Sequence, residues 1–299
     1  MARLIPAGVR PWRGVVLGAA GLYFLVPLLA ALVFTVDVPN QGFTLDSYTQ
    51  IFSADGFTTA LLLSLGLGLT TVALALLLTL PAALAVRLSG SGRLRAVLEV
   101  VCTLPLVVPP VALVAGIGTV LKWGPDHLAS TPLYETFVAV QDPEFPIVLV
   151  LAYVVMALPF VYRSLEAGLR AVDVRTLVEA ARDLGASWPR AIVSVVLPNL
   201  RTALLNASFL ALALVLGEFT VAQLLGFQPF AVWIVQASGS NAQLSVAVSL
   251  LSLVLTWVLL LVLTAVFRTR AARSARAPRP GKNRPAKNRS DKNKKEAGA

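Results

Sequence analysis

The sequence has very few residues that could carry catalytic or metal chemistry. It contains one cysteine, Cys102, and one histidine among 299 residues. A single cysteine cannot form an internal disulfide or a cysteine metal site. No G-x-x-x-x-G-K-[S/T] phosphate-binding loop occurs either, which excludes ATP binding in the P-loop manner. We therefore expect no catalytic residue, no metal site and no cofactor in this chain, and it is not predicted to be an enzyme by itself.

Charged residues are also scarce. They make up 13% of the chain, whereas hydrophobic residues make up 57% and the mean hydropathy is +0.79. A soluble domain has about 25% charged residues, so the composition predicts an integral membrane protein. The net charge of +10 belongs entirely to residues 268–299, which hold 12 Lys/Arg and 2 Asp/Glu. Because the rest of the chain is neutral, we expect no nucleic acid among its partners.

Six apolar stretches are long enough to cross a bilayer, which takes about 20 residues of helix. They cover residues 14–36, 58–86, 97–121, 146–168, 201–225 and 244–267. Backbone polar groups cannot stay unpaired in lipid, so each stretch should be helical. The first is longer than a signal-peptide core and has no obvious A-x-A cleavage site, so we interpret it as an uncleaved span. The predicted fold is all-α, with a six-span domain at residues 14–267.

The basic residues fall almost entirely on one side of the predicted spans. That side holds 24 of the 25 Lys/Arg residues, and the opposite side holds only Lys122. Positively charged loops stay in the cytoplasm. We therefore expect the N-terminal segment, residues 1–13, and the C-terminal segment, residues 268–299, to be cytoplasmic. The C-terminal segment is rich in Lys, Asn, Pro and Arg, and this composition predicts disorder.

The most informative segment is polar and lies between the fourth and fifth predicted spans, at residues 170–200. Asp173 is a suitable N-cap for a short helix over residues 174–184, and Gly185 stands where a left-handed residue would end that helix. Pro189 is tolerated in the first turn of a second helix. The apolar residues of the short helix fall on one face, which predicts an amphipathic surface helix. They are Val174, Leu177, Val178, Ala181 and Leu184.

This segment resembles the EAA loop of ABC importer permeases. The pattern of that family is Glu-Ala-Ala, three residues, Gly, nine residues and then Ile-x-Leu-Pro. The matching residues here are Glu179, Ala180, Ala181, Gly185, Leu197 and Pro198, with Val195 in place of the usual Ile. The resemblance implies that the loop forms a coupling helix that inserts into a cytoplasmic ATPase subunit. A surface helix without a partner is the alternative interpretation.

The resemblance covers about residues 55–267 and implies a type I ABC importer permease of the bacterial inner membrane. Such a permease pairs with a second permease subunit, works with separate ATPase subunits that bind the ATP, and accepts substrate from an extracellular binding protein. The Gly-Glu-Phe sequence at residues 217–219 resembles the polyamine and ferric-iron branch. We therefore expect a polyamine as substrate, or else ferric iron, thiamine or phosphonate. A secondary transporter or channel subunit is the alternative from another class.

Three residues within the predicted spans are candidates for the substrate path. Glu218 lies roughly 25 Å along the fifth span at ~1.5 Å per residue, where a carboxylate by default faces a cavity or a partner. Pro109 and Pro110 must kink or break the third span, and broken helices often line the path in transporters. The alternatives are a hydrogen bond between helices for Glu218 and a kink that only sets the helix shape for the two prolines.

Overall fold

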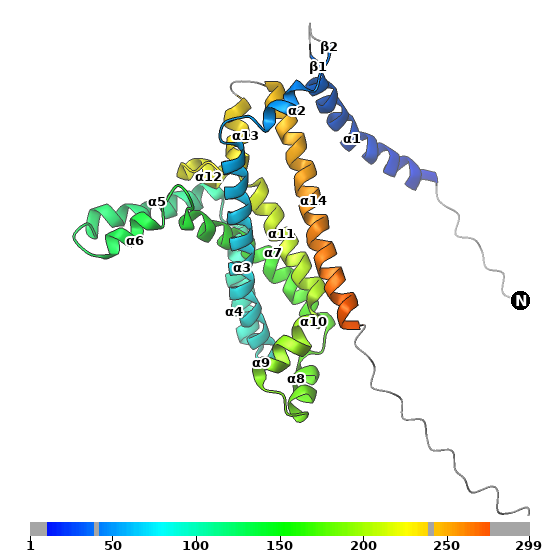
Figure 1. Cartoon of the computed structure of the whole chain (residues 1–299). Coiled ribbons are helices and arrows are strands. Elements are labelled where there is room, and N and C mark those ends of the chain that lie inside the picture. The colour runs from blue at the N-terminus through cyan, green and yellow to red at the C-terminus, as the bar shows by residue number, and fades with distance from the viewer. Residues whose placement is uncertain (1–10, 39–41, 239–241, 276–299) are drawn as a thin grey trace, which may run out of the picture.

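This computed structural model describes residues 11–38, 42–238 and 242–275, and within them the chain is almost entirely helical (Figure 1). The first half contains α1 (Pro11–Val36), α2 (Asp46–Ile51), α3 (Phe57–Ser89), α4 (Gly92–Thr103), the 3-10 turn η1 (Leu104–Leu106), α5 (Pro110–His127) and α6 (Leu133–Ala139). The second half contains α7 (Ile147–Ala171), α8 (Val174–Asp183), α9 (Trp188–Ala191), the π-helix η2 (Ile192–Val196), α10 (Leu197–Asn199), α11 (Arg201–Gly217), α12 (Thr220–Leu225), α13 (Phe230–Ser238) and α14 (Ala242–Ala275). Two short strands, β1 (Asp37–Val38) and β2 (Gly42–Phe43), pair antiparallel after α1.

The predicted all-α membrane fold is confirmed, but two of its spans are not straight. Four helices, α1, α3, α7 and α14, are long and apolar enough to cross a membrane alone. The count reaches six when each of two bent pairs is taken as one span. The bend between residues 92–106 and α5 is 98°, and the bend between residues 188–199 and α11 is 74°. The third and fifth spans are therefore broken helices.

The core of the bundle lies where α3, α7 and α11 pack together. Small residues permit this close approach, as is usual between membrane helices. A Cβ atom added to Gly68 of α3 would lie 2.7 Å from Leu212 of α11, and one added to Gly168 of α7 would meet the side chain of Ala203. Tyr153 and Leu149 of α7 are fully buried in the same core. The three helices thus form a tightly packed centre that fixes the other elements.

The ends of the chain differ in part from the prediction. Helix α14 continues without a break from the sixth span through residues 268–275, so the first part of the segment predicted to be disordered is helical. A long helix that starts in the membrane extends past its apolar part because each further residue adds one backbone hydrogen bond to an existing helix. The prediction of disorder for residues 276–299 lies outside the described residues. The predicted N-terminal segment reaches into α1, which begins at Pro11.

Two parts of the structure project from the bundle (Figure 1). The hairpin of α5 and α6 extends sideways, and α1 leads away at an angle from its contact with α14. None of the most apolar 18-residue stretch of α1 is buried, whereas 56% of the corresponding stretch of α7 is. Helix α1 therefore leaves almost all of its apolar surface uncovered by its own chain.

Candidate functional site

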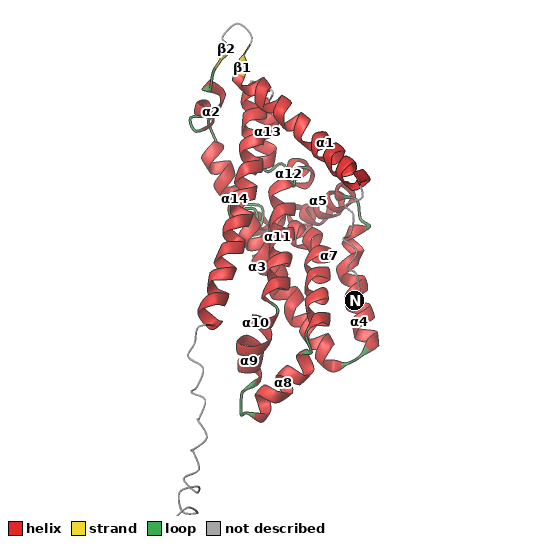
Figure 2. Ribbon diagram, turned by 90° about the vertical axis from the view of Figure 1, so that its right-hand side faces the viewer, coloured by secondary structure: helices red, strands yellow, loops and turns green. Residues whose placement is uncertain are grey.

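The polar segment between α7 and α11 forms the predicted pair of helices at one end of the bundle (Figure 2). Asp173 caps α8, as expected: Oδ1 accepts a hydrogen bond from the Thr176 amide at 3.3 Å, and Oδ2 accepts one from the Thr176 hydroxyl at 2.8 Å. These two bonds stabilise the ionised carboxylate and lower the pKa of Asp173. The start of α8 is therefore fixed by hydrogen bonds between neighbouring residues, which the sequence predicts.

One face of α8 is packed against the bundle. Val174, Val178 and Ala181 are buried in a cluster that also contains Leu84 of α3 and Leu200, the residue before α11. Ala181, the third residue of the EAA motif, is thus a packing residue whose small side chain lets α8 approach the bundle closely. This contact ties the position of α8 to the positions of α3 and α11.

Helix α8 ends in the left-handed turn that Gly185 was predicted to provide. Gly185 has φ of +84°, its amide donates to the carbonyl of Arg182 at 2.8 Å, and the Ala186 amide donates to the carbonyl of Ala181 at 3.0 Å. A residue with a side chain would be strained in this conformation. Leu184, predicted on the packed face, is 90% exposed. That prediction was wrong because α8 ends at Asp183, so the residue after it no longer follows the helical face.

The exposed side of this helix pair forms a compact surface at the end of the bundle. Trp188 is 43% exposed, and the guanidinium of Arg182 lies 5.1 Å from the centre of its ring. The side chain of Glu179 is two-thirds exposed and makes only a loose ion pair with Arg175 at 3.7 Å. We call this surface the docking tip, and its members are Glu179, Ala180, Leu184 and Trp188. Sequence reasoning missed Leu184 and Trp188 as members of this exposed surface.

The last two motif residues, Leu197 and Pro198, lie where the loop turns into α11. They follow the π-helix Ile192–Val196, and the bend into α11 is 74°. Proline has no amide to continue the helical hydrogen bonds, and the side chain of Asn199 instead donates to the Val195 carbonyl at 2.7 Å. Pro198 is exposed and Leu197 is partly buried. The Leu-Pro pair therefore sets the angle at which the loop joins the fifth span.

Glu218 lies at the opposite end of α11, at a break in the predicted fifth span. The prediction of a continuous helix over residues 201–225 was wrong, because α11 ends at Gly217 and the chain is extended at Glu218. The buried carboxylate caps α12: it accepts hydrogen bonds from the amides of Val221 at 2.9 Å and Ala222 at 3.3 Å. Both of its oxygens are occupied by backbone donors. The buried Tyr153 hydroxyl interacts with it electrostatically but does not reach hydrogen-bonding geometry.

Pro109 and Pro110 mark the break in the third span, as predicted. Pro109 is extended, with φ of −60° and ψ of 141°, and Pro110 is the first residue of α5. Pro110 lines an apolar cavity of about 370 Å³ beside the break, together with Leu104, Met156, Phe160 and Leu214. Pro109, Glu218 and the EAA residues do not line this cavity. The predicted site residues therefore fall into three separate places: the docking tip and its bend, the third-span break, and the α11–α12 junction.

Comparison with solved structures shows that this fold occurs in another transporter chain. The fold resembles a chain of a bacterial ABC transporter involved in the import of the acidic polysaccharide alginate, with a TM-score of 0.55. The match covers 87% of this chain and 99% of the other chain. The sequences are 15% identical, so this likeness concerns the fold. Together with the family match of residues 75–276, this fold defines a permease subunit of a type I ABC importer.

The family follows from sequence comparison. Residues 75–276 match the family described as "Binding-protein-dependent transport system inner membrane component", and the chain belongs to this family. It is 31% identical over 200 residues to the molybdenum transport system permease protein ModB of Mycobacterium tuberculosis, covering 67% of this chain and 71% of that protein. It is 36% identical over 138 residues to ModB of Escherichia coli K12, covering 46% and 58% respectively. Membership in this family sets aside the alternative of a secondary transporter or channel.

Proposed function

We propose that this chain couples substrate import to ATP hydrolysis by a separate cytoplasmic ATPase, which binds to the docking tip. The observation that carries this proposal is the tip itself: Leu184 and Trp188 are exposed just after α8, the helix that carries Glu179 and packs against Leu84 of α3. An apolar side chain that is exposed at the end of a surface turn suits a groove in a partner protein. In this arrangement the ATPase holds the ATP, and the permease chain itself needs no cofactor and no ATPase site.

The proposal places the docking tip and both termini in the cytoplasm, with the α2 end of the bundle outside the bacterial inner membrane. The positive-inside rule supports this orientation, because the arginines of residues 87–95 and 163–201 lie at or near the end that carries α8. At the outer end an extracellular binding protein would deliver the substrate. Pro109, Pro110 and Glu218 belong to breaks in helices, and we propose that these breaks shape the path between the two sides.

The proposed complex contains a second permease subunit, identical to this chain or different from it. The support is α1, whose apolar residues are exposed along its length, in contrast to the partly buried α3, α7 and α14. A second subunit that packs on α1 would cover apolar surface that α14 covers only near one end. The six-span bundle of this chain would then form one half of the transmembrane pathway.

We further propose that the substrate is a molybdenum oxyanion, because the relatives are named as molybdenum permeases. Neither they nor the structural neighbour carries the name of a polyamine, ferric iron, thiamine or phosphonate transporter. The contacts of Glu218 account for its carboxylate without a cation, since each oxygen accepts a backbone hydrogen bond at the start of α12. Among the described residues, Glu218 is the one acidic side chain that is buried.

Co-purification with the ATPase tests the docking proposal. Gly185→Val should reduce recovery of the ATPase with the tagged permease, because a left-handed conformation costs an L-residue about 1–2 kcal/mol and would distort the tip. Gly185→Asn is the matched control, since asparagine tolerates this conformation better than other residues with side chains. Equal ATPase recovery with both variants, in permease that is folded and inserted, would contradict docking at this turn.

Uptake measurements test the substrate separately. Cells that lack their own molybdate importer should accumulate molybdenum when they express this chain with its ATPase and binding protein, and a Gly185→Val version should not. Total molybdenum is measured in washed cells, and labelled spermidine serves as the cationic comparison. Spermidine uptake without molybdenum uptake would replace the anionic substrate by a cationic one, while leaving the docking proposal intact.

A further inference from the structure

Helix α3 turns into α4 at the end of the bundle that carries α8 (Figure 1). A small cavity of about 160 Å³ with polar residues in its lining lies at this turn. It is distinct from the docking tip and from the apolar cavity at the third-span break. Its polar lining comes from three elements: α3, the α3–α4 turn with the first residues of α4, and α7. The residues that matter for its chemistry are Arg87, Ser91, Gly92, Arg95, Tyr162 and Glu166.

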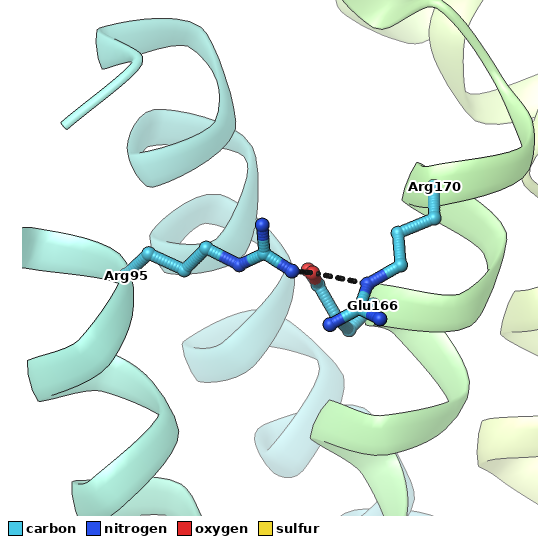
Figure 3. A network of polar contacts seen from close by, with 3 residues as sticks. All are labelled: Arg95, Glu166 and Arg170. Atoms are coloured by element: carbon cyan, nitrogen blue, oxygen red, sulfur yellow. Dashed lines mark hydrogen bonds and ion pairs between the residues drawn. The ribbon is translucent and has the colours of Figure 1, made fainter. Parts of the chain in front are cut away.

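Beside this cavity, two arginines contact a single glutamate. Figure 3 shows that Glu166 of α7 lies between Arg95 of α4 and Arg170 of its own helix. Its Oε1 atom accepts from Arg95 Nη2 at 2.6 Å and from Arg170 Nε at 2.9 Å. Two guanidinium groups therefore share one carboxylate, and one positive charge stays in excess. Glu99 of α4 is near Arg170 but does not line the cavity.

Helix α3 adds a further positive charge to the lining. Arg87, in the last turn of α3, lines the cavity and forms no ion pair within the described part of the chain. It is close enough to Asp173 to lower the pKa of that carboxyl, but the two groups are not in contact. The charged side chains that line the cavity, Arg87, Arg95 and Glu166, thus carry a net charge of +1. Outside the lining, Arg170 adds a positive charge, and Glu99 and Asp173 each add a negative charge nearby.

The cavity also offers hydrogen-bond donors that have no use inside the protein. Tyr162 is only 3% exposed, yet its hydroxyl has no hydrogen-bond partner among the residues that the structure describes. Ser91 caps α4 by accepting from the Leu94 amide at 3.4 Å, and the amides of Gly92 and Arg93 precede the first helical hydrogen bond of this 12-residue helix. Free amides at a helix N-terminus attract anions.

From these features together we infer that the cavity binds a phosphate group, supplied either by the headgroup of an anionic lipid or by free phosphate. Basic pockets between helices at the cytoplasmic face of a membrane are known to suit anionic headgroups. The bound phosphate would connect the ends of α3, α4 and α7, next to the cluster that holds α8. The inference rests on the proposed function only for the side of the membrane on which the cavity lies.

Native mass spectrometry of the purified full chain tests this site. The detergent-solubilised protein is titrated with dioleoylphosphatidylglycerol or with dioleoylphosphatidylcholine, and bound lipid is counted. We expect a preferred first phosphatidylglycerol, with affinity reduced about fivefold in Arg87→Ala, the loss expected for one basic residue at a membrane surface. Arg87 is chosen because its removal leaves the Arg95–Glu166–Arg170 network intact. Tyr162→Phe, which removes only the hydroxyl, should also weaken binding.

Arg93→Ala is the matched control, because the side chain of Arg93 is exposed and does not line the cavity, and the substitution keeps the backbone amide. Its affinity for phosphatidylglycerol should equal that of the unaltered protein. A parallel titration adds sodium phosphate: displacement of the lipid at millimolar phosphate would assign the site to a free anion, and no displacement would assign it to the lipid. Equal losses in Arg87→Ala and Arg93→Ala, or no loss in either, would overturn the site. ATPase co-purification is unaffected by that outcome, so the two proposals fail separately.

Discussion

The role inferred for Glu218 changes once its contacts are known. An acidic residue in an apolar stretch suggests a cavity or a partner, and the Gly-Glu-Phe sequence around it was the reason for expecting a polyamine. In the structure its two carboxylate oxygens accept hydrogen bonds from the backbone amides of Val221 and Ala222. Buried backbone amides need such partners, so the carboxylate first of all makes possible the break between α11 and α12. Its place on the substrate path remains a prediction.

The capping role predicts different results for two substitutions. Glu218→Gln keeps a side-chain oxygen for only one of the two amides, so it should be destabilised less than Glu218→Ala and should retain molybdenum uptake. Glu218→Ala leaves two buried amides unsatisfied, at a cost of about 1–3 kcal/mol for each, and should lower both protein yield and melting temperature. Fluorescence-detected size exclusion after heating measures the stability of each variant.

Tyr153→Phe is the control for Glu218, because it removes a buried hydroxyl beside the carboxylate that forms no hydrogen bond there. Its melting temperature should match that of the unaltered protein. A Glu218→Gln variant that is stable but inactive in uptake would contradict a purely capping role. Such a result would show that the negative charge itself acts during transport.

At the scale of elements, the contact between α7 and α11 depends on a glycine. A side chain at Gly168 would overlap with Ala203 and approach the backbone of α11 to 3.7 Å. Helix backbones that are this close leave no room for even a methyl group without a shift of one helix. Because α8 follows α7 after two residues and packs beside Leu200, such a shift would also move the docking tip.

We therefore expect Gly168→Ala to destabilise the protein by about 1–3 kcal/mol, as overpacking of a close core contact usually does. Gly118→Ala is the matched control, since a Cβ at Gly118 in α5 meets nothing within 4 Å. Melting temperatures of the two variants in the same detergent give the comparison. Equal melting temperatures would mean that α7 and α11 are less closely packed than the structure indicates.

At the scale of the whole molecule, the orientation in the membrane decides which surface meets which partner. Thiol labelling can test it, because the chain has a single cysteine, Cys102, which is buried. In a Cys102→Ser background, Leu184→Cys at the docking tip should react with a membrane-impermeant maleimide only in inverted vesicles. Asp142→Cys, exposed between α6 and α7, should react only in intact spheroplasts. The opposite labelling pattern would reverse the proposed orientation.

The sequence by itself determined the features that depend on neighbouring residues. Apolar stretches of sufficient length had to be helices, because lipid offers no other partner for the backbone. Asp173 and Gly185 fixed the two ends of α8 through contacts within three or four residues. The prolines at positions 109 and 110 excluded a straight third span for the same local reason. The EAA spacing then identified the family, which the comparison of residues 75–276 bears out.

Only the tertiary structure decided the features that depend on distant residues. The ion pair of Arg95 with Glu166 joins positions 71 residues apart, and no local sequence pattern predicts it. The burial of Ala181 follows from where α8 rests on α3 and on Leu200, not from the periodicity of α8 alone. The role of Glu218 depended on where α11 stops. Periodicity records which residues can share a face, but burial and charge pairing depend on what the rest of the chain places against that face.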